Sequence, residues 1–335
     1  MNNILLVCPK FRGYEKVIKN SILKNKIGRV DGFFYDEIKV FNISFFQNFI
    51  ISILIRFLSI IRTKWAYEFK FKFYTDNSIL MDKILIKHDL KDYTHLFIIK
   101  GFGLRKKDLD LVKSLGIKVY FYQWDSEFFY PGITQLYDPC DRVFSFEHSK
   151  IEKVKFLPNF YVKTQTFSLE KKIQSIFYIG KFSFYRWFVL YKASRKLKRS
   201  STPQLFDVSL LSVKKSLGFL PLVTNVELKL PELKDKYSSS LFCLEFSDAG
   251  QHGITQRVFD ILENHSYICV LDENEKARLI KFGVAKELIY TVKDIIEQNF
   301  PSIEDTQDIF FKQTKINSKY DVDNWITTIF NKDGQ

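Results

Sequence analysis

The chain has 335 residues, which is longer than a usual single domain, so two domains of roughly 150 residues are expected. Its hydrophobic fraction of 46%, with 35 Phe and 17 Tyr, suffices for two aromatic-rich cores. The four cysteines lie far apart, which excludes a Cys-x-x-Cys metal site and argues against a disulfide framework. Reduced cysteines fit a cytoplasmic protein, and the start, Met1-Asn-Asn-Ile, runs into an apolar segment with no signal-peptide pattern.

The net charge of +13 comes from 51 basic and 38 acidic residues and calls for an anionic partner. An anionic membrane surface, an anionic substrate and nucleic acid are the candidates. A nucleic-acid-binding protein usually concentrates its charge along one stripe among exposed aromatic side chains. Here the basic residues are spread over both halves of the chain, with clusters at 16–26 and 191–199. This distribution argues against nucleic acid.

The first half of the chain alternates apolar runs with amphipathic segments. Buried strands are expected at 3–8, 30–35, 94–100, 117–122 and 142–146, and helices at 14–26 and 105–114. Buried strands joined by crossover helices indicate a parallel sheet with helices on both faces. Ligands bind beyond the carboxyl ends of strands in such sheets, which draws attention to the loops at 9–13, 101–103 and 123–128.

Segment 45–61 is almost entirely apolar. It is slightly short for a membrane-spanning helix, and Gln47, Asn48 and Arg56 interrupt it. Two interpretations follow. The segment is either a buried helix of the first domain or an exposed apolar helix that lies in a membrane interface beside the basic residues of 62–72.

A second α/β unit is expected to begin near residue 173, after a linker at 155–172. Its predicted strands are 173–179, 205–211, 241–246, 267–271 and 288–291, and its predicted helices are 184–197 and 258–262. The tail from 307 to 330 is expected to form two helical pieces. The predicted division is therefore a first domain at 1–160, a second at 173–306, and C-terminal helices at 307–335 that pack back on the first domain.

The most informative segment is Asp248-Ala-Gly-Gln-His-Gly-Ile-Thr-Gln-Arg-Val-Phe-Asp260, which follows a predicted strand and opens into a predicted helix. A polar glycine loop before a helix presents free N–H groups and the positive end of the helix dipole to a phosphate. Arg257 adds a cation, Thr255 a hydroxyl, and Asp260 a carboxylate for sugar hydroxyls. The pattern indicates a sugar-nucleotide site. An ordinary strand–helix connection with a solvated Arg257–Asp260 pair is the alternative.

Five regions of the chain carry a resemblance to a known family. They are Ile4-Leu-Leu-Val-Cys-Pro9 with Phe33-Phe-Tyr-Asp36; Ile99-Lys-Gly101 with Tyr122-Gln-Trp-Asp-Ser126; Asp141-Arg-Val-Phe-Ser-Phe146 with Phe156-Leu-Pro-Asn-Phe-Tyr161; Phe177-Tyr-Ile-Gly180 with Arg186; and Gln251-His-Gly-Ile-Thr-Gln-Arg-Val-Phe-Asp260.

These regions resemble bacterial surface-polysaccharide glycosyltransferases, the capsular and lipopolysaccharide biosynthesis proteins related to spore-maturation-type glycosyltransferases. The resemblance implies an α/β fold of the GT-B type, in which two Rossmann-like domains have parallel sheets that face a cleft. The last region is similar to the family's Gly-Leu-Thr-x-Arg-x-x-Glu segment. Asp260 stands where the family has Glu, which shortens the reach to a ribose, and Asn264-His265 replaces the usual small-residue turn.

The resemblance implies that the second domain binds the donor. Gly180 would allow close approach of the phosphates, and Arg186 and Arg257 would neutralise them. In the loop, Gly253 and Thr255 would donate hydrogen bonds. Each assignment has a structural alternative: a tight turn at Gly180, a surface helix charge at Arg186, and a helix N-cap at Thr255.

Two further donor contacts are predicted in the same segment. Asp260 would hold ribose or sugar hydroxyls, and His252 would contact the leaving phosphate. A lone loop histidine is more often simply exposed. No Asp-x-Asp signature appears in a strand-end loop, so phosphate charge is expected to be met by Arg, Lys and helix dipoles without a metal ion or other cofactor.

An inverting transfer needs a carboxylate or histidine beside the acceptor hydroxyl. Asp125, after the predicted strand 117–122, is the first candidate for this base, and its alternative role is a capping carboxylate for the following helix. Glu147 and His148, after the strand ending at 146, are the second candidates.

The favoured function is transfer of a sugar from a nucleotide-sugar donor to a growing cell-surface polysaccharide or lipid-linked glycan. The protein would then be cytoplasmic, with peripheral contact to the anionic inner membrane. Another sugar-nucleotide-binding enzyme, such as an epimerase, and a catalytically silent scaffold are the alternatives. A Gly-x-Gly-x-x-Gly fingerprint is missing after the first strand, which argues against an NAD-dependent enzyme. A silent member should have lost its phosphate-binding cations, and Arg186 and Arg257 are both present.

Overall fold

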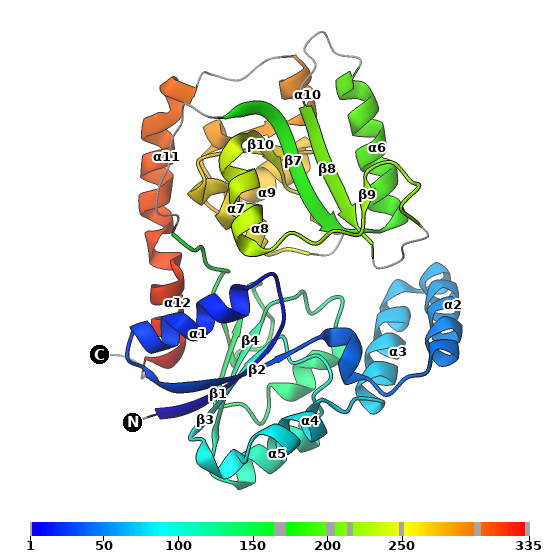
Figure 1. Cartoon of the computed structure of the whole chain (residues 1–335), viewed down its shortest axis with the longest axis vertical. Helices are drawn as coiled ribbons and strands as arrows, with labels where there is room; N and C mark the ends of the chain where they lie inside the picture. The colour runs from blue at the N-terminus through cyan, green and yellow to red at the C-terminus, as the bar shows by residue number, and fades with distance from the viewer. Residues whose placement is uncertain are drawn as a thin grey trace. The chain divides into compact units, whose positions relative to one another are not determined.

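The computed structural model describes residues 2–163, 172–198, 205–212, 217–247, 251–297 and 303–331. The chain divides into two compact units (Figure 1). Unit 1 comprises Met1–Asn159, Asp248–Gly253 and Val322–Gln335, and unit 2 comprises Phe160–Ser247 and Ile254–Asp321.

Unit 1 is built on a six-stranded sheet in the order β2-β1-β3-β4-β5-β6, and every neighbouring pair is parallel. The strands are β1 (Asn2–Pro9), β2 (Gly28–Tyr35), β3 (His95–Ile99), β4 (Lys118–Gln123), β5 (Arg142–Ser145) and β6 (Val154–Phe156). The five strands expected from the apolar runs are confirmed: the inner strands are buried on both sides because helices cover both faces of the sheet, whereas the edge strand β2 alternates and exposes Arg29 and Asp31. The short β6 was not predicted.

Helices cover both faces of the unit 1 sheet (Figure 1). They include α1 (Tyr14–Lys24), α4 (Leu80–Lys87), α5 (Lys106–Ser114) and α12 (Val322–Phe330), with the short 3-10 helices η1 (Glu37–Val40), η2 (Leu90–Asp92) and η3 (Pro131–Leu136). Leu96 and Ile98 on β3 share a core cluster with Leu109 of α5, whereas the ring of Phe97 lies 6.3 Å from that of Trp325 on α12. This alternation is the period-two pattern of a strand buried on both faces.

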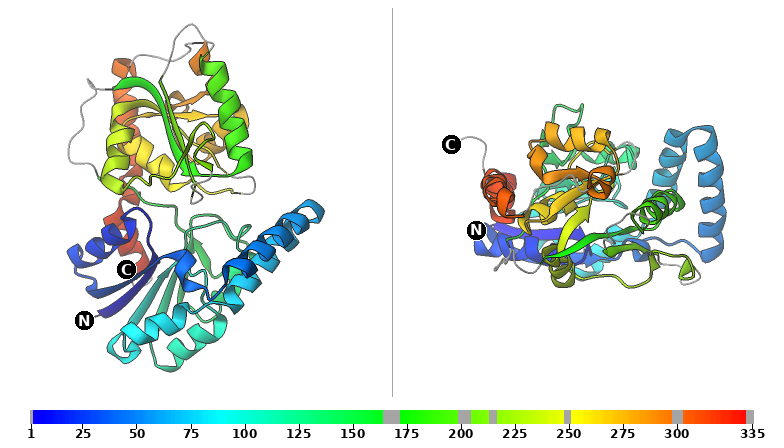
Figure 2. Two further views of the ribbon diagram at one scale, coloured as in Figure 1. Left: turned by 45° about the vertical axis from the view of Figure 1, so that its right-hand side comes forward. Right: turned by 90° about the horizontal axis from the view of Figure 1, so that it is seen from above.

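Helices α2 (Phe45–Ile61) and α3 (Thr63–Asp76) lie side by side and extend away from the unit 1 sheet (Figure 2). Ser44 begins α2 with a reciprocal capping box to Gln47. Among the α2 side chains that the structure describes, Ile51 alone is buried. The interpretation of 45–61 as a buried helix is therefore wrong, because the helix pairs mainly with α3. No helix within the described ranges is long and apolar enough to cross a membrane.

Unit 2 contains a second six-stranded parallel sheet in the order β12-β11-β10-β7-β8-β9. Its strands are β7 (Ile173–Lys181), β8 (Leu205–Leu211), β9 (Val223–Thr224), β10 (Ser240–Leu244), β11 (Tyr267–Val270) and β12 (Ile289–Thr291). Its helices are α6 (Phe184–Lys198), α7 (Leu230–Ser239), α8 (Gln256–Glu263), α9 (Glu273–Lys281), α10 (Val292–Ile296) and α11 (Ile303–Asn317), with the 3-10 helices η6 (Lys286–Leu288) and η7 (Ser318–Tyr320).

Two predicted boundaries differ from the structure. The expected return of the C-terminal segment to the first domain is made by α12 alone, because α11 belongs to unit 2. The linker predicted at 155–172 starts too early, since β6 extends to Phe156 and the division between the units falls after Asn159. Residues 164–171 of that linker lie outside the described part of the chain.

The turn after α8 contains His265, whose φ of 52° is left-handed. Its imidazole stacks on the Phe310 ring at 5.5 Å. Burial, and secondarily the charge of Lys172, lowers the pKa of His265 from 6.5 to about 4.

We expect unit 2 to lose stability as the pH falls from 6.5 towards 4, because the unfolded chain then binds a proton at His265 that the folded chain does not. Well above pH 6.5 the group is neutral in both states and contributes no pH dependence. Asn tolerates left-handed backbone, so His265→Asn should flatten this part of the profile. Urea unfolding of the wild type and of His265→Asn between pH 4 and 6.5 measures how the free energy of unfolding depends on pH. An unchanged pH dependence in His265→Asn would assign the effect to other groups.

Candidate functional site

A buried carboxylate, Glu245, organises the carboxyl edge of the unit 2 sheet. It directly follows β10, and its side chain is fully buried. The Thr255 hydroxyl donates to both carboxylate oxygens at 2.9 and 3.0 Å, and the Ser247 hydroxyl donates to one of them at 3.0 Å. Two cations complete the shell: Arg257 donates to Glu245 at 3.0 Å, and Arg278 lies 3.8 Å away. Glu245 was not predicted as a site residue.

Arg257 is held between the two central strands of unit 2. Besides its pair with Glu245, the guanidinium donates to the Ile179 carbonyl at 3.3 Å and lies 4.6 Å from the centre of the Tyr178 ring. Burial alone would lower the pKa of Arg257, but Tyr178 and Glu245 outweigh it and raise the pKa above its usual value. Arg257 is thus a permanently charged, fixed group. The alternative of a solvated pair with Asp260 is wrong, because the partner is Glu245.

Gly180 makes room for this arrangement. It lies within β7 opposite Leu210, so the alternative of a tight turn is wrong. A Cβ at Gly180 would come within 2.2 Å of the Tyr178 hydroxyl, and Tyr178 is buried. A side chain at this position would therefore displace the ring on which Arg257 stacks. The predicted approach of a phosphate to Gly180 stays a prediction.

Two further arginines lie at the same edge of the sheet. Arg186, in the first turn of α6, is half-buried, donates to the Lys181 carbonyl at 3.2 Å and sits 5.4 Å from the Phe246 ring. Arg278 of α9 donates to Ser247 at 2.7 Å and pairs with Glu275 at 2.9 Å. The contacts with Lys181 and Phe246 fix the direction of the Arg186 guanidinium, and its binding to a phosphate stays a prediction. Guanidinium groups fixed in this way suit a diphosphate, because each group can donate two parallel hydrogen bonds to a pair of phosphate oxygens.

Helix α8 places the other predicted donor residues. Thr255 occupies its N-cap position, but the hydroxyl bonds to Glu245 rather than to a backbone N–H of the helix. Asp260 is only 3% exposed, and the Gln256 amide lies 3.5 Å from its carboxylate. The proposed contact of Asp260 with a sugar hydroxyl remains untested, and its burial argues against it.

In unit 1, Glu147 anchors the loop that precedes α8. Its carboxylate accepts the backbone N–H of His252 at 2.7 Å and of Gly253 at 3.1 Å. A Cβ at Gly253 would lie 2.7 Å from the Phe146 carbonyl oxygen, so glycine permits this approach. The His252 side chain is exposed. Glu147 is buried and committed to two N–H groups, which fits a loop anchor better than a base.

We expect Glu147→Ala to destabilise the fold by about 1–3 kcal/mol, because two backbone N–H groups lose their acceptor. Glu147→Gln retains a carbonyl oxygen for them and should cost less. Urea unfolding compares the two, with the exposed Glu152→Ala as the control. Equal effects of Ala and Gln would contradict the anchoring role.

His148, the other second-choice base, is exposed, and its ring stacks on Phe156 with centroids 3.9 Å apart. The first choice, Asp125, follows β4 and belongs to an ionic cluster. The Lys100 ammonium lies 2.6 Å from Asp125 and 2.6 Å from Glu37. The alternative of Asp125 as a helix cap is wrong, since the next helix, η3, has Tyr130 at its N-cap.

Lys100 bridges the carboxyl ends of three strands of unit 1. It follows β3 with a left-handed φ of 70°, and Gly101 continues with 60°. Burial alone would lower the pKa of Lys100, but Asp125, Tyr130 and Glu37 together raise it above its usual value. The lysine is therefore charged and fixes the direction of the Asp125 carboxylate, which stays about one-third exposed. Lys100 and Glu37 were not predicted as site residues.

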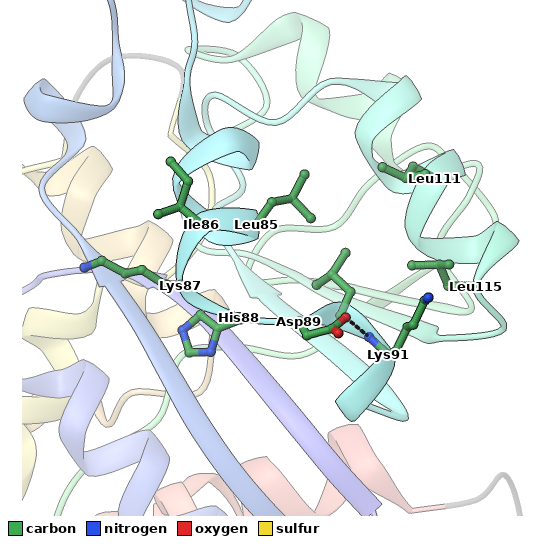
Figure 3. Close-up of a pocket in the computed structure, with 9 residues that line it drawn as sticks. Leu85, Ile86, Lys87, His88, Asp89, Lys91, Leu111 and Leu115 are labelled. Atoms are coloured by element: carbon green, nitrogen blue, oxygen red, sulfur yellow. Dashed lines mark hydrogen bonds between the residues drawn. The ribbon is translucent and has the colours of Figure 1, made fainter.

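A hollow of about 580 Å³ lies elsewhere in unit 1, between α4, η2 and α5 (Figure 3). Its lining includes Leu85, Ile86, His88, Leu111 and Leu115. These elements precede β3 and β4, so the hollow is at the amino ends of the strands, and no predicted site residue lines it. Within the described ranges, no group of three or more His, Cys, Asp or Glu side chains is placed to hold a metal ion.

The two sheets and their helices form the GT-B fold. The glycosyltransferase SnogD from Streptomyces nogalater is similar over 98% of this chain and 99% of its own, with a TM-score of 0.55 and 8% identity. A UDP-glucosyltransferase from Polygonum tinctorium matches over 99% of both chains, with a TM-score of 0.50 and 9% identity.

The same fold occurs in an enzyme of another class. UDP-GlcNAc 2-epimerase from Neisseria meningitidis, whose structure contains UDP-GlcNAc, matches over 98% of both chains with a TM-score of 0.50 and 11% identity. No protein-family model matches the sequence, and no curated protein matches it either. At these identities the comparisons establish the fold.

Proposed function

We propose that the protein is a glycosyltransferase that moves a sugar from a nucleotide-sugar donor to a growing cell-surface polysaccharide or lipid-linked glycan. The cluster of Arg186, Arg257 and Arg278 around Glu245 carries the proposal. It lies at the carboxyl edge of a parallel sheet, which is where such sheets bind ligands.

Fixed guanidinium groups would bind the donor phosphates and stabilise the negative charge that develops on the leaving nucleotide. The transfer would therefore need no metal ion. Glu245 contributes by holding Arg257 in place before the donor arrives. On the acceptor side, Asp125 would accept the proton of the attacking hydroxyl. Its carboxylate is partly exposed and is oriented by Lys100.

The neighbours support a nucleotide-sugar donor, since they include a UDP-glucosyltransferase and an epimerase with UDP-GlcNAc bound. The cell-surface acceptor rests on the family resemblance and on the exposed apolar helix α2, which suits an enzyme that works at the cytoplasmic face of a membrane. An epimerase is the second candidate, because the Neisseria enzyme shares the fold to a similar degree.

Titration with uridine, guanosine, thymidine and cytidine sugar nucleotides tests the proposal by thermal shift. One nucleotide class should raise the melting temperature. Arg186→Ala should weaken the binding of that donor by about 1.5–3 kcal/mol, because a charge-assisted hydrogen bond is lost. Arg195→Ala, an exposed arginine on the same helix, should not. If no sugar nucleotide binds, or if both variants bind equally well, the donor site is misplaced.

A further inference from the structure

Helix α2 carries a continuous apolar stripe on its exposed side. The stripe follows an i, i+4 row at Phe45, Phe49, Ile53 and Phe57, with a second row at positions 46, 50 and 54. Phe45 is 88% exposed and Phe57 is 61% exposed. All seven side chains are large and apolar, and a soluble surface rarely leaves such a stripe uncovered without a partner.

The stripe is not the side of α2 that supports the fold. Ile51, which is buried, lies on the other side of the helix, and Asn48 accepts a hydrogen bond from Tyr74 of α3 at 2.8 Å. Packing against α3 therefore uses one face of α2 and leaves the stripe outward. Figure 2 shows that the two helices extend from the unit 1 sheet.

The hairpin that carries the stripe is basic. The segment 45–76 contains five Lys or Arg and only two Asp or Glu residues. Arg62, in the turn between the helices, lies 5.1 Å from the ring of Trp65, which is 49% exposed. An exposed apolar stripe in a basic hairpin that also exposes a tryptophan is the pattern of a helix that lies in a membrane interface.

We propose that the α2–α3 hairpin docks on an anionic lipid bilayer. The α2 stripe enters the boundary between headgroups and acyl chains, and the basic residues bind lipid phosphates. Charge favours a lipid bilayer over a second copy of the chain. Two hairpins packed face to face would bring their positive charges together, and these charges would repel each other. Anionic lipids neutralise those charges instead.

Sedimentation with vesicles tests the docking on the full chain. The protein should bind vesicles of phosphatidylglycerol and phosphatidylcholine at low salt, and less at high salt, since exposed charges are screened over about 8–10 Å at physiological ionic strength. Phosphatidylcholine alone should bind it weakly. The triple variant Phe45→Ser, Phe49→Ser, Phe57→Ser should lower binding at least about tenfold. Ile86→Ser, which removes an exposed apolar side chain from α4, is the matched control.

Quenching of the Trp65 fluorescence by brominated lipid gives a second readout. The variant Trp65→Phe measures the contribution of the other tryptophans. Absence of binding to anionic vesicles at low salt would overturn the proposal, as would triple-variant binding equal to wild type. A triple variant that becomes monomeric while it still binds vesicles would show that the stripe pairs two copies. Vesicle binding requires no sugar transfer, so a failure of docking and a failure of the glycosyltransferase activity are distinguishable.

Discussion

Asp125→Asn should reduce sugar transfer by about 10²–10⁴-fold and leave donor binding and melting temperature nearly unchanged. Asparagine keeps the shape of the side chain and can still accept a hydrogen bond from Lys100, but it cannot take the proton of the acceptor hydroxyl. Initial rates at saturating donor, together with a donor titration, separate the two effects.

Glu37→Gln is the matched control for this variant. Glu37 and Asp125 each lie 2.6 Å from the same Lys100 nitrogen, and their side chains are 36% and 34% exposed. If Asp125 only balances the charge of Lys100, both variants should lose similar activity. If Asp125 is the base, Asp125→Asn alone should be inactive. Near-normal turnover in Asp125→Asn would reject the catalytic role.

Glu245→Leu should destabilise the protein by about 3–5 kcal/mol and abolish donor binding. Removal of the carboxylate leaves the Arg257 charge without its carboxylate partner in a mostly buried position. A buried charge that loses its partner destabilises a protein more than the removal of both charges does. Arg257 would also lose the partner that aims it. Urea unfolding and donor titration measure the two losses.

The double variant Glu245→Leu, Arg257→Met separates stability from function. It removes both charges, so most of the lost stability should return, because apolar pairs often replace buried ion pairs without loss. Donor binding should stay weak, since the phosphate cation is missing. A double variant as unstable as Glu245→Leu, or one that binds donor normally, would contradict the account of this site.

The alternation of apolar runs and helical segments was enough to predict most of both sheets, because strands buried on two faces read as short continuous hydrophobic runs. The strands β6 and β9 were not predicted, because they contain only three and two residues and show no periodic pattern in the sequence. The exposure of α2 could not be read from its composition. An apolar helix is ordinarily covered, and only the packing of α3 shows which face is left open.

The sequence identified Arg257 as a phosphate-binding candidate, and only the alternative that paired it with Asp260 is wrong. The i, i+3 spacing pointed to Asp260, whereas the closer carboxylate, Glu245, comes from the end of β10. A signal for Glu245 was present, because it interrupts the apolar run 241–246 and a buried carboxylate needs cations or donors. Lys100 stood only inside the segment Ile99-Lys-Gly101, and nothing in the sequence tied Lys100 to Glu37 or Arg278 to Glu245, because strand order brings each pair together.

The most direct test of the proposed glycosyltransferase is a product assay with a labelled nucleotide sugar and a lipid extract as acceptor. The account predicts that label enters the extract, that free nucleotide is released in equal amount, and that both require the acceptor and are lost in Asp125→Asn. Conversion of the sugar nucleotide to an epimer without any acceptor, or no turnover with a donor that binds, would contradict it.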